Sequence, residues 1–418
     1  MRYLLLIFCC YTMPLFAQNK QPSKKEANLL EQLMRSKPEL FKSILENKDS
    51  LRLQIIYTKI DRDKNNKPTF TDYTFNVNNN TYFYPASTVK MPIAFLALEK
   101  LNSLKKYGVD MNSTMVTDSS FSGQDRVYTN PTAKDSKASV ANYIKQIFLV
   151  SDNDAFNRLY EFLGQAYIQQ KLADKGFTDA VIRHRLQISL TNEQNRATNP
   201  ISFYDSTGKL LYKQEGQYSN AIFPKPNVAI GKGYYKGDKL INQPFNFSEK
   251  NRVYLQDLHH ILQSVLFADA VPSKQQFNLT PTDYSFVKHW MSAYPRESAY
   301  PYYDTANHWD AYCKFLLLGS DKGSLPPSIR VFNKVGDAYG FLTDVAYIID
   351  TEKKVEFMLS ATLLCNKDGI FNDDKYDYET VGFPFMKNIG QLIYEYELQR
   401  KRKNIPNLHS FTINYTQD

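Results

Sequence analysis

The sequence has few cysteines, and their small number excludes a disulfide-held fold. Four of its 418 residues are cysteines, and two of these, Cys9 and Cys10, lie in an apolar leader. The other two, Cys313 and Cys365, are too few for the disulfide framework that stabilises many small exported domains. We therefore expect Cys313 and Cys365 to be unpaired, buried thiols.

Histidines in metal-binding order are also lacking. His259 and His260 lie together in a predicted helix, and His289 and His308 each precede a tryptophan. None of them follows the ligand spacing of a zinc site. We expect no bound metal and no cofactor, and we interpret these histidines as core or surface residues.

Long clusters of one charge and internal repeats are absent as well. The formal net charge is +8, and the basic residues are scattered apart from the run RKRK at 400–403. Scattered charge is typical of a solvated surface and does not favour nucleic-acid binding. The hydrophobic share of 43% and the aromatic share of 14% indicate a folded globular protein with ample core material.

The first residues have the pattern of an export signal. The segment MRYLLLIFCCYTMPLFAQ begins with the charge of Arg2, continues with an apolar run and offers Ala17 as a small residue for cleavage. Pro14 interrupts the run, which is too short to span a bilayer comfortably. We expect cleavage of residues 1–17, export to the periplasm, and a mature protein that is a monomer with no stable membrane span.

The pattern of apolar residues predicts an α+β fold. Helical periodicity marks the segments 22–48 (with a kink at Pro38), 139–150, 254–267 and 383–399. Strand patterns mark the segments 51–61, 68–77, 328–336, 341–350 and 354–364. Strands near both chain ends around a helical middle predict one sheet built from both ends, with a helical subdomain inserted between them.

A serine and a lysine at the start of an apolar helix form the first candidate motif, in the stretch YPASTVK. Ser87 lies where the helix begins, so backbone N–H groups and the positive end of the helix dipole point toward its hydroxyl. Lys90 shares its helix face and can reach that oxygen. The same spacing recurs at Ser103/Lys106 and Ser206/Lys209, where we expect only surface residues.

Two further motifs follow in the chain. Ser151-Asp152-Asn153 is the only S-D-N in the sequence, and it separates two predicted helices. Lys334-Val335-Gly336 lies between two strong strand patterns. Each motif is weak evidence alone, since a loop that caps a helix or a solvated lysine would explain it.

Together and in this order, the motifs resemble those of the class A β-lactamase and penicillin-binding-protein superfamily, which are S-x-x-K, S-D-N and K-T-G. The resemblance covers roughly residues 25–200 and 325–400, because the gap between Ser151 and Lys334 is far longer than usual. It implies a serine-hydrolase domain at 18–400 with an antiparallel sheet, an all-helical subdomain that carries an insertion at about 200–325, and a polar tail at 401–418.

The resemblance implies a role for each polar residue of the first two motifs. Ser87 would be the acylated nucleophile and Lys90 its base. Ser151 would relay a proton to the leaving nitrogen, and Asn153 would hold Lys90 and the substrate amide.

The third motif would complete the site. Lys334 would supply positive charge near the substrate carboxylate and Ser151. Gly336 and Asp337 would bind substrate, with the backbone N–H groups of Ser87 and Asp337 forming an oxyanion hole.

Two departures from the family pattern concern substrate binding and deacylation. Val335 replaces the threonine of K-T-G, which would remove a hydroxyl that binds the substrate carboxylate. In class A enzymes a glutamate of the Ω-loop activates the deacylating water, and its pattern is missing from RHRLQISLTNEQNRATNP. Glu193 is the only carboxylate there, so it is a candidate base although its register is wrong.

These features predict an exported serine hydrolase of the class A β-lactamase type, acting on a β-lactam or a related amide through acyl-Ser87 with slow deacylation. Two alternatives stay open. One is a D,D-peptidase that acts on peptidoglycan stem peptides, and the other is a non-catalytic homologue that binds cell-wall peptides.

Overall fold

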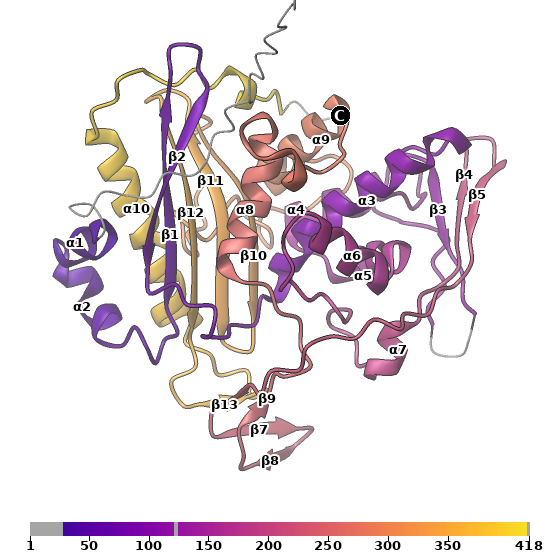
Figure 1. Ribbon diagram of the computed structural model, residues 1–418, viewed down its shortest axis with the longest axis horizontal. Coiled ribbons are helices and arrows are strands. Elements are labelled where there is room, and N and C mark those ends of the chain that lie inside the picture. The colour runs from indigo at the N-terminus through magenta and orange to yellow at the C-terminus, as the bar shows by residue number, and fades with distance from the viewer. Residues whose placement is uncertain (1–27, 121–123, 416–418) are drawn as a thin grey trace, which may run out of the picture.

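The computed structural model describes residues 28–120 and 124–415. It shows a central sheet with helices on both of its faces (Figure 1). The predicted signal at 1–17, with Cys9 and Cys10, lies outside the described residues. Within the described part, no helix is both long enough and apolar enough to cross a membrane.

The helices and strands have the following bounds. The helices are α1 (Leu29–Arg35), α2 (Pro38–Glu46), α3 (Lys90–Leu104), α4 (Val140–Val150), α5 (Asn153–Leu163), α6 (Gln165–Asp174), α7 (Asn192–Arg196), α8 (Leu255–Leu266), α9 (Pro281–Ser292) and α10 (Phe383–Gln399). The strands are β1 (Gln54–Arg62), β2 (Pro68–Phe75), β3 (Thr114–Thr117), β4 (Ile201–Tyr204), β5 (Leu210–Gln214), β6 (Ala229–Ile230), β7 (Gly233–Lys236), β8 (Lys239–Ile241), β9 (Phe245–Asn246), β10 (Ile329–Ala338), β11 (Phe341–Asp350), β12 (Val355–Leu364) and β13 (Ile370–Phe371).

The central sheet confirms the predicted α+β class. Its strand order is β10-β11-β12-β1-β2, and every neighbouring pair is antiparallel. The two ends of the chain meet in the register Gln54↔Thr362 between β1 and β12. As predicted, both chain ends therefore build one sheet, and β10 lies at its edge.

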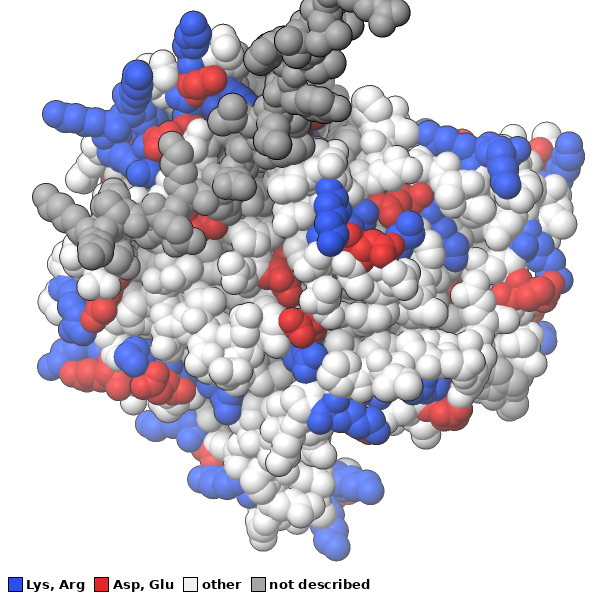
Figure 2. All heavy atoms as spheres, viewed as in Figure 1, with Lys and Arg blue, Asp and Glu red and all other residues white. Residues whose placement is uncertain are grey.

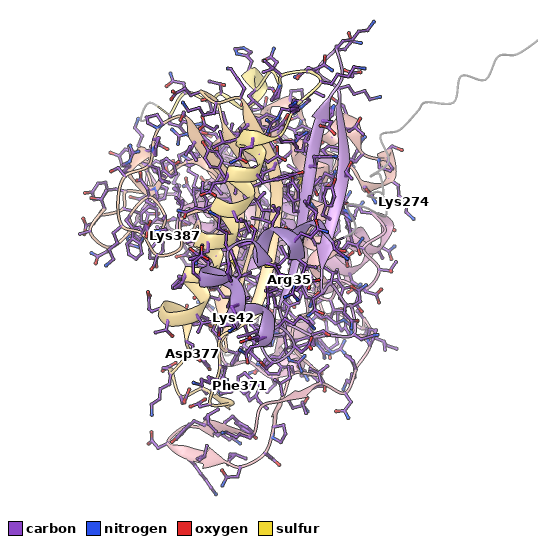
Figure 3. All side chains as sticks on the ribbon, turned by 90° about the vertical axis from the view of Figure 1, so that its left-hand side faces the viewer. Arg35, Lys42, Lys274, Phe371, Asp377 and Lys387 are labelled. Carbon is purple, nitrogen blue, oxygen red and sulfur yellow. The ribbon has the colours of Figure 1, made fainter. Side chains whose placement is uncertain are left out.

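Helices cover the two faces of this sheet. Helices α1, α2 and α10 lie over one face (Figure 3). Helix α8 and the helical subdomain lie on the other (Figure 1). Because both faces are covered, every residue of β11 and β12 is buried, which explains their nearly continuous apolar sequences.

Pro38 breaks the first predicted helix into two. Helix α1 ends at Arg35, and α2 begins with Pro38 as its first residue. Proline suits this position because its ring fixes a helical φ and the first turn needs no N–H donor. The predicted kink is thus the boundary between two short helices.

The segment 200–325 is spread over the molecule, which corrects its assignment to the helical subdomain alone. Strands β4 and β5 pair with β3 and add a small sheet to that subdomain. Strands β6 to β9 form, together with β13, a lobe that projects below the body (Figures 1 and 3). Helix α8 packs on the central sheet itself, where His259 bonds Thr58 and Ser360.

The end of the chain also differs from its prediction as a polar tail. Leu408 and Phe411 are buried, and the Phe411 ring contacts those of Phe267, Phe332 and Tyr347. Ile413 and Tyr415 also pack against the core, so this largely polar stretch is held by its few apolar residues. Elsewhere the surface shown in Figure 2 carries acidic and basic side chains side by side, as the scattered charges of the sequence predict.

Candidate active site

The first motif lies at a strained turn before α3. Ala86 has φ +46°, in the left-handed region, and residues Ala86–Val89 form a short 3₁₀ helix that leads into α3. The hydroxyl and the N–H of Thr88 both bond the carbonyl of Pro85, at 2.6 and 3.0 Å. The turn leaves Ser87 half-buried at the head of a helix that is buried from Lys90 to Leu101.

Two more residues with positive φ border the site, which is where strained backbone tends to cluster in proteins. Ser151 has φ +60° at the C-terminal end of α4, and Gln187 has φ +56° in the loop before α7. Asp152 then caps α5 by accepting a hydrogen bond of 2.7 Å from the N–H of Ala155. The S-D-N motif is therefore a fixed corner between two helices.

Gly336 brings the edge strand against the turn that carries Ser87. A Cβ on this residue would lie 2.6 Å from the oxygen of Pro85, 2.8 Å from the nitrogen of Thr88 and 2.9 Å from the nitrogen of Ser87. These are backbone atoms and cannot move aside as a flexible side chain would. The contact requires glycine, and it places the backbone after Gly336 beside Ser87.

Gly336→Ala is therefore expected to separate β10 from the nucleophile turn. We expect a loss of about 1–3 kcal/mol in the free energy of unfolding, because an added methyl group in a packed site forces a backbone shift. Chemical denaturation measures this loss. Gly323→Ala is the matched control, since a Cβ there meets open space. Equal stability of the two variants would contradict the close approach.

Lys90 is fully buried and its ammonium position is surrounded by oxygens. Its Nζ donates to Asn153 Oδ1 at 2.7 Å and to the carbonyl of Ser151, and it lies 3.3 Å from Ser151 Oγ. Burial, with the nearby charge of Lys334, holds the pKa of Lys90 well below its ordinary value. A neutral lysine has two N–H groups, and two carbonyl-type oxygens accept them here. Its lone pair is then left for a serine hydroxyl.

Lys334 reaches the same serine from the sheet. Its Nζ donates to Ser151 Oγ at 2.8 Å and to the carbonyl of Val335 at 2.9 Å. Burial lowers the pKa of Lys334 to about 8, and Asp337 opposes that shift. The structure thus brings all three motifs together, with Ser151 Oγ between two lysines.

The other two Ser-x-x-Lys pairs lie on the surface. Ser103, Lys106, Ser206 and Lys209 are all exposed, and the hydroxyl of Ser103 bonds the carbonyl of Lys100. Only Ser87 and Lys90 are joined to the other motifs by the fold. The sequence context of an apolar helix start was therefore the informative signal.

Gln187 is a site residue that the sequence reasoning missed. Its Oε1 accepts a hydrogen bond of 2.6 Å from Asn153 Nδ2, and Asn153 in turn holds Lys90. The family pattern predicts a carboxylate in this loop, and the structure has a carboxamide there. An amide oxygen is too weak a base to take a proton from water at neutral pH.

The loop that presents Gln187 is held firmly. Asn157 makes two hydrogen bonds with the backbone of Leu186, at 2.9 and 3.0 Å. The guanidinium of Arg185 pairs with the buried carboxylate of Glu161 at 2.9 Å. Asn251, from the inserted segment, accepts hydrogen bonds from the N–H groups of Arg183 and His184. These contacts fix the backbone that leads to Gln187.

Glu193 does not lie at the site. Its side chain is 71% exposed in the first turn of α7 and is 3.9 Å from Arg196. None of its interactions among the described residues involves Lys90, Ser151 or Asn153. The hypothesis that Glu193 activates the deacylating water is therefore wrong, because its side chain points into solvent and away from Lys90 and Ser151.

The position of Val335 also corrects the sequence interpretation. Side chains alternate along a strand, so Val335 points away from the face that carries Lys334 and Gly336. It is buried in the core under α10 with Leu342 and Leu363. A hydroxyl at this position would face the core and not the side of β10 that carries Lys334.

Tyr303, Tyr312 and Cys313 of the inserted segment lie near the motifs. The charges of Lys90, Lys334 and Asp337 act on the Cys313 thiol, and the charge of Asp152 acts on the Tyr303 phenol. Burial raises the pKa of Cys313 to about 11, so this thiol is not a nucleophile at neutral pH. Cys313 and Cys365 are both free and buried, which confirms the prediction.

A buried polar network fixes this segment behind β10. Lys314 Nζ donates to the carbonyls of Met291 and Val331 and to Asn333 Oδ1, at 2.8 to 3.1 Å. The carboxylate of Asp344 accepts the N–H groups of Phe315 and Leu316 at 3.0 and 2.9 Å. The segment around Lys314, which lies beside the site, is therefore fixed to the central sheet.

His259 is one of the histidines predicted to be core or surface residues, and it lies in the core. His259 is buried between Thr58 and Ser360, at 2.7 Å from each hydroxyl, and burial lowers its pKa to about 4. No group of three or more His, Cys, Asp or Glu residues that could hold a metal occurs in the described part of the chain.

Comparisons with known proteins agree with this geometry. The model of the β-lactamase enzyme family matches residues 41–217, which include the first two motifs. This match covers less than half of the chain, and it supports the resemblance to the β-lactamase and penicillin-binding-protein superfamily that the three joined motifs indicate. The match supports a serine hydrolase of the β-lactamase or penicillin-binding type. A search of curated proteins finds no match.

Several solved structures are similar at low sequence identity. An ancestral class A β-lactamase is 15% identical with a TM-score of 0.46, and 88% of this chain covers 99% of that one. PBP-A is 14% identical with a TM-score of 0.47, and the match covers 91% of this chain and 98% of PBP-A. A β-lactamase from Burkholderia phymatum is 14% identical with a TM-score of 0.48, and the match covers 90% of this chain and 98% of that one.

Proposed function

We propose that this protein is an exported acyl-serine hydrolase of the class A β-lactamase type, which attacks a β-lactam or related amide and deacylates slowly. The observation that carries the proposal is the hydrogen bonding of Lys90. Nζ lies within hydrogen-bond distance of Asn153 Oδ1, the Ser151 carbonyl and Ser151 Oγ, and burial favours the neutral amine by lowering the pKa of Lys90. A neutral amine at this place can accept a proton from Ser87.

Acylation then follows from the positions of the motifs. The proton of the Ser87 hydroxyl passes to Lys90 Nζ as Oγ bonds the substrate carbonyl carbon. The N–H groups of Ser87 and Asp337 stabilise the oxygen that becomes negative. Ser151 gives its proton to the leaving nitrogen and regains one from Lys90, 3.3 Å away, while the C–N bond breaks. The products are acyl-Ser87 and a free amine.

Deacylation has no comparable support. It needs a base that takes a proton from the attacking water, and the loop side chain bonded to Asn153 is the carboxamide of Gln187. This observation also favours the second candidate function, a D,D-peptidase of peptidoglycan stem peptides. Such an enzyme can be slow to release a penicilloyl group and still act on its own substrate.

The proposed acylation predicts a bell-shaped dependence of rate on pH. The rate should rise as pH passes the lowered pKa of Lys90, because only the neutral amine is a base. It should fall above about pH 8, where Lys334 loses the proton that it donates to Ser151. Labelling rates with a fluorescent penicillin between about pH 5 and 10 measure the profile. A rate that still climbs beyond pH 9 would contradict the role of Lys334.

A time course of intact mass after exposure to benzylpenicillin tests the proposed function. We expect an adduct of one penicilloyl group that persists for hours, with little nitrocefin turnover. Release of D-alanine from a stem peptide would assign the natural activity to a D,D-peptidase. Rapid nitrocefin turnover without adduct would contradict slow deacylation. Absence of both adduct and turnover would favour the non-catalytic binding homologue.

A further inference from the structure

A cavity of about 650 Å³ lies between the end of α8, the first turns of α9 and the tail residues 410–413. Helices α8 and α9, which form two of its sides, lie on the same side of the central sheet (Figure 1). None of the residues that line the cavity belongs to the three motifs, so it is distinct from the site at Ser87. Volumes of about 300–1,000 Å³ are typical of sites for small ligands.

The wall of this cavity has apolar side chains that the fold leaves partly uncovered. Leu279, Tyr284 and Ile413 line it, and each packs on the core with only part of its surface. The hydroxyl of Tyr284 is already engaged, because it donates to the carbonyl of Phe277 at 3.2 Å. An apolar ligand chain that covered these side chains would remove their surface from water, which favours binding.

Lys288 brings an uncompensated positive charge to the same cavity. Its Nζ lies 4.7 Å from the centre of the Phe411 ring, and it has no hydrogen-bond acceptor and no ion pair among the described residues. Burial lowers the pKa of Lys288, because its ammonium is partly removed from water. An anionic group of a ligand would supply the acceptor that this ammonium lacks.

The other polar groups of the lining favour a ligand with a single negative charge. Arg62 is already neutralised by Glu356, to which its Nε and Nη2 donate at 2.7 and 2.6 Å. Asp269 is exposed, and its charge acts on Lys288 without an ion pair. A second negative charge on the ligand would meet this carboxylate and no further free cation. Ser285, three residues before Lys288 on the same face of α9, adds a hydroxyl donor.

We propose that this cavity is a binding site for a fatty acid. The carboxylate accepts hydrogen bonds from Lys288 and Ser285, and the alkyl chain lies along Leu279, Tyr284 and Ile413. The single charge of the head group matches the one free cation, and the chain matches the uncovered apolar wall. The site goes beyond the proposed function and does not depend on it, because it uses no residue of the cleft at Ser87.

Titration of the purified protein with cis-parinaric acid, whose fluorescence rises in an apolar site, tests the proposal. We expect saturable binding of one molecule. Decanoic acid should displace this probe at a concentration at least about tenfold lower than 1-decanol, which has a chain of the same length without the charge. Absence of saturable binding, or displacement by 1-decanol at the same concentration as decanoic acid, would overturn the proposal.

Variants of the lining show whether the probe occupies this cavity. Lys288→Met keeps a long side chain without the charge and should weaken binding at least about tenfold. Ser285→Trp should abolish binding by filling the cavity, and it decides alone if Lys288→Met does not fold in denaturation experiments. Lys274→Met, an exposed change before α9, should bind like wild type. Wild-type affinity in a folded Lys288→Met or Ser285→Trp protein would overturn the proposal.

Discussion

Gln187→Glu is expected to convert a persistent acyl-enzyme into one that is hydrolysed. A positioned general base contributes about 10²–10⁴-fold to a proton-transfer step, and we expect the deacylation rate to increase by a factor in this range. Gln187 already reaches Asn153 at 2.6 Å, and the two side chains have nearly the same shape. The carboxylate would therefore occupy the place of the carboxamide, and the accepting oxygen would be retained.

The contacts that hold the Gln187 loop support this prediction. Asn157 and Asn251 hold the backbone that leads to the new carboxylate, at Leu186 and at Arg183, so it should be presented without rearrangement. The lifetime of the penicilloyl adduct, followed by intact mass after removal of free antibiotic, measures the effect. Nitrocefin turnover should rise in parallel.

The matched control is Ser189→Glu, which adds a carboxylate to an exposed position two residues further along the same loop. It should leave the adduct lifetime unchanged, and so should Glu193→Gln, because Glu193 points into solvent. An unchanged lifetime in Gln187→Glu, or a longer adduct in Glu193→Gln, would contradict the assignment of the deacylation defect to Gln187.

Lys90→Met should reduce the rate of acylation by about 10²–10⁴-fold, because it removes the only base placed at the head of α3. Methionine fills most of the buried space but leaves Asn153 Oδ1 and the Ser151 carbonyl without their donor. An unpartnered buried acceptor costs about 1–3 kcal/mol, so some loss of stability should accompany the loss of rate. Second-order labelling by fluorescent penicillin measures the rate.

Lys106→Met is the control for this experiment, since Lys106 is the exposed lysine of the Ser103 pair. It should label at the wild-type rate. Denaturation curves of both variants separate a chemical effect from partial unfolding. A Lys90→Met protein that is folded and labels within a fewfold of wild type would show that another group accepts the Ser87 proton.

The order of strands and the three motifs could be predicted because each has a strong local signal. Residues 341–350 and 354–364 are mostly apolar, as is typical of strands buried on both faces. The S-D-N corner and the helix start at Ser87 are short and stand next to apolar helices. The fold then joins them through Lys90 and Lys334.

The orientation of Val335 and the role of Gln187 could not be predicted in the same way. The strand pattern places Lys334 and Val335 on opposite faces, but only the structure shows which face borders the cleft. Gln187 belongs to a loop without periodicity, and its contact with Asn153 depends on anchors far away in the sequence, such as Asn251.

The long insertion was beyond sequence reasoning for a related reason. Its aromatic residues indicate a core or a groove equally well, so composition does not locate them. Helix α8 lies on the central sheet through the buried contacts of His259, while Cys313 lies near Lys90 and Lys334. Contacts between residues so distant in sequence carry no local signal.

The central claim is that Ser87, alone among the three Ser-x-x-Lys serines, is an activated nucleophile. Peptide mapping by mass spectrometry after exposure to benzylpenicillin tests it most directly, with wild type, Ser87→Ala and Ser103→Ala treated in parallel. We predict one adduct on the peptide that contains Ser87 in wild type and in Ser103→Ala, and none in a folded Ser87→Ala protein. An adduct that survives in Ser87→Ala, or one that maps to another peptide, would contradict the claim.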